Sequence, residues 1–236
     1  RATGASWITG TRGADYSIEP ADAAAQVAAA DPDIIFLCSP NNPTGTPLDI
    51  AVIEAVYEAS RGMVIVDEAY WEFAPKDQRS AITLLEGRPR LLVSRTMSKA
   101  FAFAGARVGY LAADPAVIDA LRLVRLPYHL SALTQAAALA ALDHSAEMLG
   151  MVDEIVVQRD RISATLTELG YTPLASWSNF VLFGGVADPA LMWQELYDRG
   201  ILIRDVGIPG HLRVTAGTAD ETTAFLEALA SIDSNA

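Results

Sequence analysis

Short apolar runs alternate with amphipathic stretches along the first half of the chain. Buried strands are predicted at Ile34–Cys38, Met63–Val66 and Leu91–Val93, and a fourth strand at 107–112. Between the first two strands, apolar residues recur at helical spacing over 50–57, directly after a predicted N-cap at Asp49. The alanine-rich stretch 21–30 predicts another helix. This alternation indicates an α/β domain with a largely parallel sheet, covered on both faces.

The pattern changes after Asp114. Residues 131–170 have an almost entirely helical pattern, and the apolar runs that follow are short. Strands are predicted at 179–183, 201–203 and 212–214, with helices over 191–197 and 222–232. This predicts a second, smaller α/β layer after a long helix. We therefore expect two domains, residues 1–127 and residues 128–236.

Composition and charge exclude several classes of partner. The chain is 51% hydrophobic and 19% charged, as expected for a soluble globular protein, and it carries a net charge of −12. Nucleic acids and anionic membranes require basic surfaces, so neither is expected as a partner. The residues given predict no signal peptide, and they contain no apolar run long enough to span a membrane. The single cysteine, Cys38, fits a reducing compartment, and we expect a cytoplasmic protein.

Polar motifs follow the predicted strands, where α/β sheets bind their ligands. The loop Ser39–Gly45 (SPNNPTG) is typical of a rigid turn, and its asparagine amides could also donate to a ligand. Asp67 follows a fully apolar run; it could cap a helix, or its carboxylate could meet a cation such as a protonated pyridine nitrogen. The three histidines are too scattered to indicate a metal site.

Lys99 is one of only two lysines, beside fifteen arginines. Arginine stays protonated and cannot act as a nucleophilic amine, whereas a desolvated lysine can. Thr96, Ser98 and Arg107 surround Lys99 in sequence, and hydroxyls with a guanidinium suit a phosphate. A surface lysine in a loop is the competing interpretation.

Two arginines in the second half stand between apolar strand residues. Arg204 and Arg213 would each need a buried acid if their roles were structural. A substrate carboxylate or phosphate could satisfy them equally well. The sequence leaves both interpretations open.

These motifs, in this order, resemble the fold-type-I pyridoxal-phosphate (PLP) aminotransferases. The resemblance runs from 40–45 (PNNPTG) to 213–218 (RVTAGT). Within that family, four segments are most similar to the histidinol-phosphate aminotransferases: 67–73, 96–101, 125–131 and 200–207. The resemblance implies a three-layer PLP-dependent transferase fold with a mostly parallel central sheet and a smaller C-terminal α/β domain. Residues 1–127 would be the C-terminal part of the large PLP-binding domain.

The resemblance also implies roles around the cofactor ring. Lys99 would hold PLP as a Schiff base and then move protons as a base. Asp67 would pair with the pyridinium nitrogen and keep it protonated. Asn42 and Tyr70 would hydrogen-bond the phenolate oxygen of the ring.

Anionic groups of the cofactor and substrates are assigned in the same way. The cofactor phosphate would be bound by Thr96, Ser98 and Arg107. The substrates would be bound by Arg213, Arg204 and Asn42. Two arginines in one pocket could serve both histidinol phosphate, which lacks a carboxylate, and glutamate, which has two.

The implied reaction converts histidinol phosphate and 2-oxoglutarate to imidazole-acetol phosphate and glutamate, in a homodimer. Alternatives on the same scaffold are an aromatic or broad-specificity aminotransferase, a phosphothreonine decarboxylase, and a non-catalytic PLP-binding regulator. The chain begins at Arg1, and about the first third of the usual family sequence has no counterpart here. We therefore expect these 236 residues alone to be poorly active.

Overall fold

The structure contains two separate β-sheets. It is a computed structural model and describes residues 4–233, so Arg1 lies outside it. The first sheet has the order β1-β2-β3-β4. Its strands are β1 (Ile34–Cys38), β2 (Met63–Asp67), β3 (Leu91–Thr96) and β4 (Gly109–Ala113). The β1–β2 and β2–β3 pairs are parallel and β3–β4 is antiparallel, which confirms the expected mostly parallel sheet.

Helices pack on one face of the first sheet. They are α1 (Pro20–Ala30), α2 (Ile50–Ala59) and the 3₁₀ turn η2 (Ala81–Leu84). Asp49 caps α2 as predicted, its carboxylate accepting from the Ala51 amide at 2.8 Å. The strand residues that pack beneath these helices alternate along each strand: Ile35, Leu37, Val64, Val66, Leu91 and Val93.

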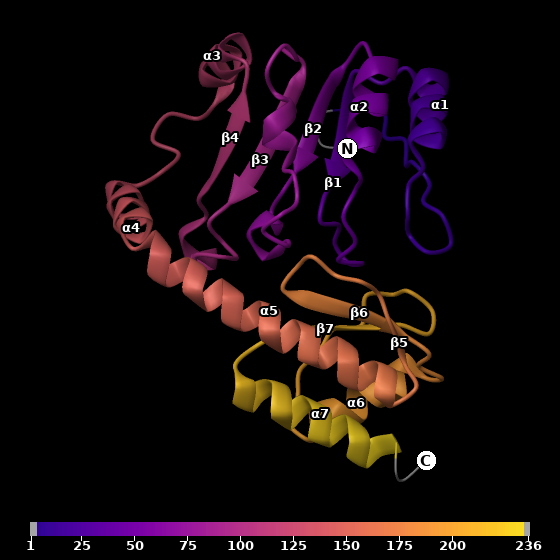
Figure 1. Ribbon diagram of the computed structural model, residues 1–236. Helices are drawn as coiled ribbons and strands as arrows, with labels where there is room; N and C mark the ends of the chain where they lie inside the picture. The colour runs from indigo at the N-terminus through magenta and orange to yellow at the C-terminus, as the bar shows by residue number, and fades with distance from the viewer. Residues whose placement is uncertain (1–3, 234–236) are drawn as a thin grey trace.

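The other face of the sheet differs from the expectation. On β1, Ile34 and Phe36 are 54% and 57% exposed, so the prediction of a sheet covered on both faces was wrong for this strand. The physical reason is that α1 and α2 both lie on the same side, where they contact each other (Figure 1). A continuous apolar run cannot show which of its two faces has a partner.

The second sheet is antiparallel, in the order β5-β6-β7. Its strands are β5 (Thr172–Pro173), β6 (Phe180–Gly184) and β7 (Leu212–Thr215). The helices of this half are α4 (Ala132–Asp143), α5 (Ser145–Glu168), α6 (Pro189–Asp198) and α7 (Ala219–Asp233). Figure 1 shows α5 running between the first sheet and α7, along the second sheet.

Several boundaries were not predicted correctly. The helical region 131–170 is divided at His144, and α3 (Pro115–Val124) was not predicted at all. The predicted strand 201–203 is not formed; the residue that follows it, Arg204, pairs with β7 through a single bridge to Arg213. Among the described residues, no helix is long and apolar enough to cross a membrane.

The two faces of the second sheet have different neighbours. Val181, Phe183, Leu212 and Val214 belong to the core formed with α5, α6 and α7. Phe180 belongs instead to a cluster with Tyr70 and Phe73, which come from the loop after β2. The second sheet therefore turns one face toward the carboxyl ends of β1 and β2.

Candidate active site

The carboxyl ends of three neighbouring strands bring polar side chains to one level of the first sheet. Cys38, Asp67 and Ser94 are in register on β1, β2 and β3. The Ser94 hydroxyl donates to the Asp67 carboxylate at 3.2 Å. Since Val64 and Val66 face α2, alternation along β2 directs Asp67 to the opposite face. Asp67 thus lies on the face of the sheet that α1 and α2 leave open.

A cluster from four distant segments lies beside this strand end. The Asn42 amide donates to the Tyr70 hydroxyl at 3.5 Å, and the Asn42 carbonyl oxygen accepts from Arg213 Nη1. The ammonium of Lys99 lies 5.5 Å from the centroid of the Tyr70 ring. The Asn42–Arg213 contact joins residues 171 positions apart in sequence. The structure therefore brings four predicted site residues together.

The pKa of the Tyr70 phenol is raised, first of all by burial; Arg213 and the hydrogen bond from Asn42 act in the opposite direction. A raised pKa keeps this hydroxyl protonated at neutral pH, so it can donate a hydrogen bond. Tyr70 itself is almost completely buried at 8% exposure. Its hydroxyl is thus a neutral donor held beside Asn42.

The segment before Lys99 forms a compact hydroxyl pair. The Thr96 hydroxyl lies 2.9 Å from the Ser98 hydroxyl and 3.2 Å from the Val108 carbonyl, and the Ser98 amide donates to Thr96 Oγ1 at 3.1 Å. Arg107 is exposed, and its guanidinium donates to the Ala104 carbonyl at 3.1 Å. Although Arg107 precedes Val108 in sequence, its guanidinium forms no hydrogen bond with Thr96 or Ser98 among the described contacts.

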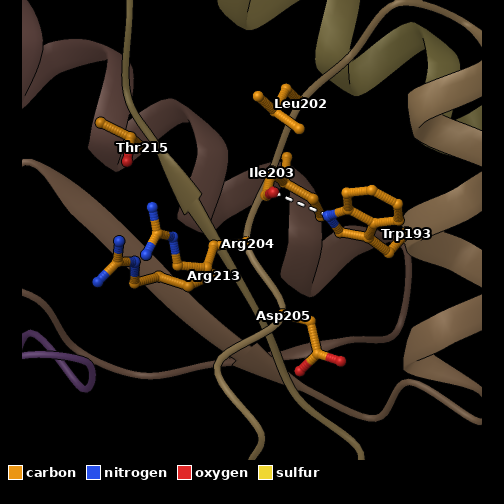
Figure 2. A pocket seen from close by; sticks show the side chains of 7 residues that line it. All are labelled: Trp193, Leu202, Ile203, Arg204, Asp205, Arg213 and Thr215. Atoms are coloured by element: carbon orange, nitrogen blue, oxygen red, sulfur yellow. Dashed lines mark hydrogen bonds between the residues drawn. The ribbon is translucent and has the colours of Figure 1, made fainter.

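Arg204 and Arg213 face each other across an antiparallel bridge, with both backbone hydrogen bonds at 2.9 Å. Figure 2 shows their guanidinium groups side by side, at the edge of a hollow of about 470 Å³. Its walls are formed by Trp193, Leu202, Ile203, Arg204, Asp205, Arg213 and Thr215. Neither arginine forms a salt bridge with a described acid. The geometry therefore favours an anionic ligand over a structural ion pair.

Arg213 is only partly satisfied by the protein. Its Nε is buried without a hydrogen-bond partner among the described residues. Burial lowers the pKa of its guanidinium, Tyr70 raises it, and the nearby Arg204 lowers it. Two like charges held together favour binding of a doubly charged anion.

A buried ion pair behind the strand ends was not predicted. Glu68 is 1% exposed and accepts from the Arg95 guanidinium at 2.7 and 3.0 Å. Its carboxylate also accepts from the Ser80 hydroxyl and the Ala81 amide, each at 2.7 Å. Glu68 and Arg95 each follow a residue that faces the site, so strand alternation sends them to the opposite side. That alternation was the one signal in the sequence that could have revealed the pair.

Glu72 is a second carboxylate beside the same guanidinium. Its Oε1 lies 3.5 Å from Arg95 Nη1, while its buried Oε2 has no partner among the described residues. Burial raises the pKa of Glu72, and Arg95 only partly opposes this. A raised folded-state pKa means that the contribution of Glu72 to stability is present at low pH and is lost as pH rises through the folded-state value.

We therefore expect Glu72→Gln to raise the free energy of unfolding at pH 7 by roughly 1 kcal/mol, because it removes a buried, under-satisfied charge. Below pH 4 the protonated glutamic acid and glutamine are equivalent, so the difference should vanish. Urea unfolding of both proteins at the two pH values measures this. A glutamine variant that is less stable at pH 7 would contradict the assignment.

Comparison with known proteins identifies the class. The family model for aminotransferase class I and II matches residues 7–229, so the chain belongs to this family. The histidinol-phosphate aminotransferase of Paenarthrobacter aurescens is 62% identical over 98% of the chain and 63% of its own length. That of Streptomyces avermitilis is 54% identical over 97% of the chain and 63% of its length. The chain thus spans less than two thirds of these relatives.

A solved structure agrees with the sequence matches. The histidinol-phosphate aminotransferase of Sinorhizobium meliloti, determined in complex with pyridoxal-5′-phosphate, superposes with a TM-score of 0.84 at 28% identity. The match covers 97% of this chain and 64% of that one. The predicted family and fold class are confirmed, and membership of this family implies pyridoxal phosphate as the cofactor.

Proposed function

We propose that the gene product containing this chain is a PLP-dependent aminotransferase that acts on histidinol phosphate and 2-oxoglutarate. The observation that carries the proposal is the convergence of Lys99, Tyr70, Asn42 and Arg213 beside Asp67, at the carboxyl end of a parallel sheet. This combines an amine, a neutral phenol donor, an amide and an anion-binding guanidinium. Parallel sheets bind ligands at this end.

The residues present fit the cofactor. The Asp67 carboxylate accepts a hydrogen bond from the Ser94 hydroxyl, and a protonated ring nitrogen would give it a charged partner as well. Asn42 and Tyr70 supply donors for the ring oxygen. The phosphate would be bound by Thr96, Ser98 and Arg107. For Arg107 this requires its guanidinium to leave the Ala104 carbonyl, which an exposed side chain can do at little cost.

Bound PLP would supply an electron sink that withdraws electrons from the substrate α-carbon. Lys99 would hold the cofactor covalently and would afterwards move a proton between the α-carbon of the substrate and C4′ of the cofactor. Asp67 would keep the ring nitrogen protonated, because a carboxylate at hydrogen-bond distance stabilises the charged form. The Tyr70 hydroxyl and the Asn42 amide would orient the ring by donating to its oxygen atom.

The arginine pair supports the choice of substrates. Histidinol phosphate presents a phosphate and no carboxylate, whereas glutamate presents two carboxylates. Arg213 and Arg204 line one hollow and have no acidic partner among the described ion pairs, so either anion could be bound there. The relatives at 54–62% identity carry the name histidinol-phosphate aminotransferase, which favours this substrate over an aromatic amino acid or threonine phosphate.

A comparison of amino donors tests the proposal. The gene product is loaded with PLP, and kcat/KM is measured for histidinol phosphate, phenylalanine and threonine phosphate, with 2-oxoglutarate as acceptor. We expect histidinol phosphate to be preferred over phenylalanine by at least about 100-fold, since the single carboxylate of phenylalanine cannot satisfy both arginines and unpaired polar groups of a site penalise a ligand strongly. Threonine phosphate carries the same phosphate, so the arginines alone do not exclude it, and its turnover is measured directly. Higher activity on phenylalanine, or release of carbon dioxide from threonine phosphate, would replace the substrate assignment. A protein that binds PLP but transfers no amino group would favour the regulator alternative.

The organisation of the molecule belongs to the same proposal. We infer two domains, 1–127 and 128–236, because one core cluster draws on Ala23 to Val93 and another on Ile162 to Ile232. We also infer a cytoplasmic homodimer. Exposed apolar side chains on and around α3 and α4 support the dimer: Leu123, Val124, Leu126 and Leu133 are 74–87% exposed. Tyr128, within this stretch, is 97% exposed and has no assigned role.

A further inference from the structure

The aromatic ring of Phe180 lies between two side chains of the site. Its edge-to-face contact with Tyr70 has a centroid distance of 5.2 Å and an interplanar angle of 85°. The guanidinium carbon of Arg213 lies 4.5 Å from the centroid of the same ring. Phe180 is 2% exposed, so its ring is shielded from water, while Arg213 is half-buried. One buried ring thus contacts a residue from each half of the molecule.

The register of the second sheet explains this placement. Leu182 on β6 pairs with Arg213 on β7, and Phe180 lies two residues before Leu182. Phe180 and Arg213 are therefore diagonal neighbours on one face of the sheet, a spacing that aromatic and long side chains can bridge. The backbone at Phe180 is fixed on both sides: its carbonyl accepts from the Ser176 hydroxyl at 2.6 Å, and the Asn179 carbonyl accepts from the Ala216 amide at 2.9 Å.

The contact matters because Arg213 has few other restraints. Asn42 binds one guanidinium nitrogen, while the buried Nε has no hydrogen-bond partner among the described residues. A cation over the face of a desolvated ring is attracted by the ring quadrupole. The ring therefore holds the guanidinium in place while its outer nitrogens remain available for an anion.

We infer that Phe180 is a positioning residue that fixes the Arg213 guanidinium for the acidic group of the substrate. Its second contact, with Tyr70, fixes the position of Arg213 relative to the residues that would bind the cofactor. This inference rests on the proposed function of Arg213. It adds a residue that contacts neither the substrate nor the cofactor and acts only through two that do. It also gives a physical link between the small sheet and the loop after β2.

A matched pair of substitutions separates this role from simple packing. Phe183 lies on the same strand, is fully buried, and also makes an edge-to-face contact, with Tyr171 at 5.6 Å. Its ring faces the helical core and not the site. Phe180→Leu and Phe183→Leu should therefore have similar costs in stability, because each removes part of a buried ring from the same strand. Only Phe180→Leu should weaken the binding of dicarboxylates.

The test measures KM and kcat for glutamate in the PLP-loaded gene product, and the Kd of glutarate for the PLP-free protein by calorimetry. We expect Phe180→Leu to raise both KM and Kd about tenfold, through loss of the cation–π contact with a buried ring, with a smaller change in kcat. Phe183→Leu should leave both constants within about twofold of the parent. Equal changes in the two variants, or no change in Phe180→Leu, would overturn the inference.

An NMR measurement covers the case in which the variants fold poorly. The Arg213 side-chain protons of the unsubstituted gene product, assigned by comparison with Arg213→Lys, should be shifted upfield by the ring face. Unshifted signals would overturn the inference without reference to activity. If the parent protein shows the shift but transfers no amino group, the proposed function fails while the stacking geometry stands.

Discussion

Lys99→Ala should abolish amino transfer and remove the visible absorption band of the PLP-loaded protein. In the proposed function, Lys99 would supply both the amine that bonds the cofactor and the base that moves the proton. Its removal should therefore lower kcat by at least about 10⁴-fold, the upper range for a single proton-transferring group. Steady-state kinetics and an absorption spectrum of the same preparation measure the two effects.

The chain provides a matched control in its other lysine. Lys76 is exposed, with a side chain 83% accessible, and pairs with Asp153 at 2.8 Å on the surface. Lys76→Ala should keep the absorption band and change kcat by less than about twofold, because exposed ion pairs contribute little. An absorption band that persists in Lys99→Ala, or disappears in Lys76→Ala, would contradict the assignment of the amine.

Arg95→Met should cost about 3–5 kcal/mol in the free energy of unfolding, because it leaves the Glu68 carboxylate buried and without its cation. The Arg95 side chain is 14% exposed and that of Glu68 is 1% exposed. The pair lies directly behind Asp67 and Thr96, so the cofactor site should lose alignment as well. Urea unfolding monitored by circular dichroism gives the free energy, and PLP affinity reports on the site.

Two further variants make this test specific. Arg61 pairs with Asp31 and Asp33 at the surface, where its side chain is 61% exposed, so Arg61→Met should cost far less stability than Arg95→Met. Adding Glu68→Gln to Arg95→Met should recover part of the lost stability, because it removes the uncompensated charge while keeping an acceptor for the Ala81 amide. A double variant that is less stable than Arg95→Met would show that the loss is not electrostatic.

The sequence indicated most of the first sheet and its helices. The apolar runs at β1, β2 and β3 and the helical spacing after Asp49 are local patterns. They predicted these elements correctly, because such patterns depend only on residues close together in sequence. The sequence was less informative about the second half of the chain. The segment 201–203 is apolar enough for a strand, but whether it pairs depends on a neighbour 10 or more residues away.

The residue types of the site were evident in the sequence. Lys99 stands out because lysine is almost absent, and Asp67 because it ends an apolar strand. Parallel strands place their carboxyl ends together, so a shared location for such residues could be expected from the pattern alone. Arg204 and Arg213 were recognised too, but the sequence left open whether they bind an internal acid or a ligand.

How these residues meet depends on contacts that no local pattern encodes. The contact of Arg213 with Asn42, the ring of Phe180 beneath Arg213, and the ion pair of Glu68 with Arg95 all join separate elements. Such contacts depend on strand register and on how two sheets pack, and a one-residue change in register would reverse which side chains face the site. The chemical groups of the site could therefore be identified from the residue types, whereas the distances between these groups follow from the packing of the two sheets.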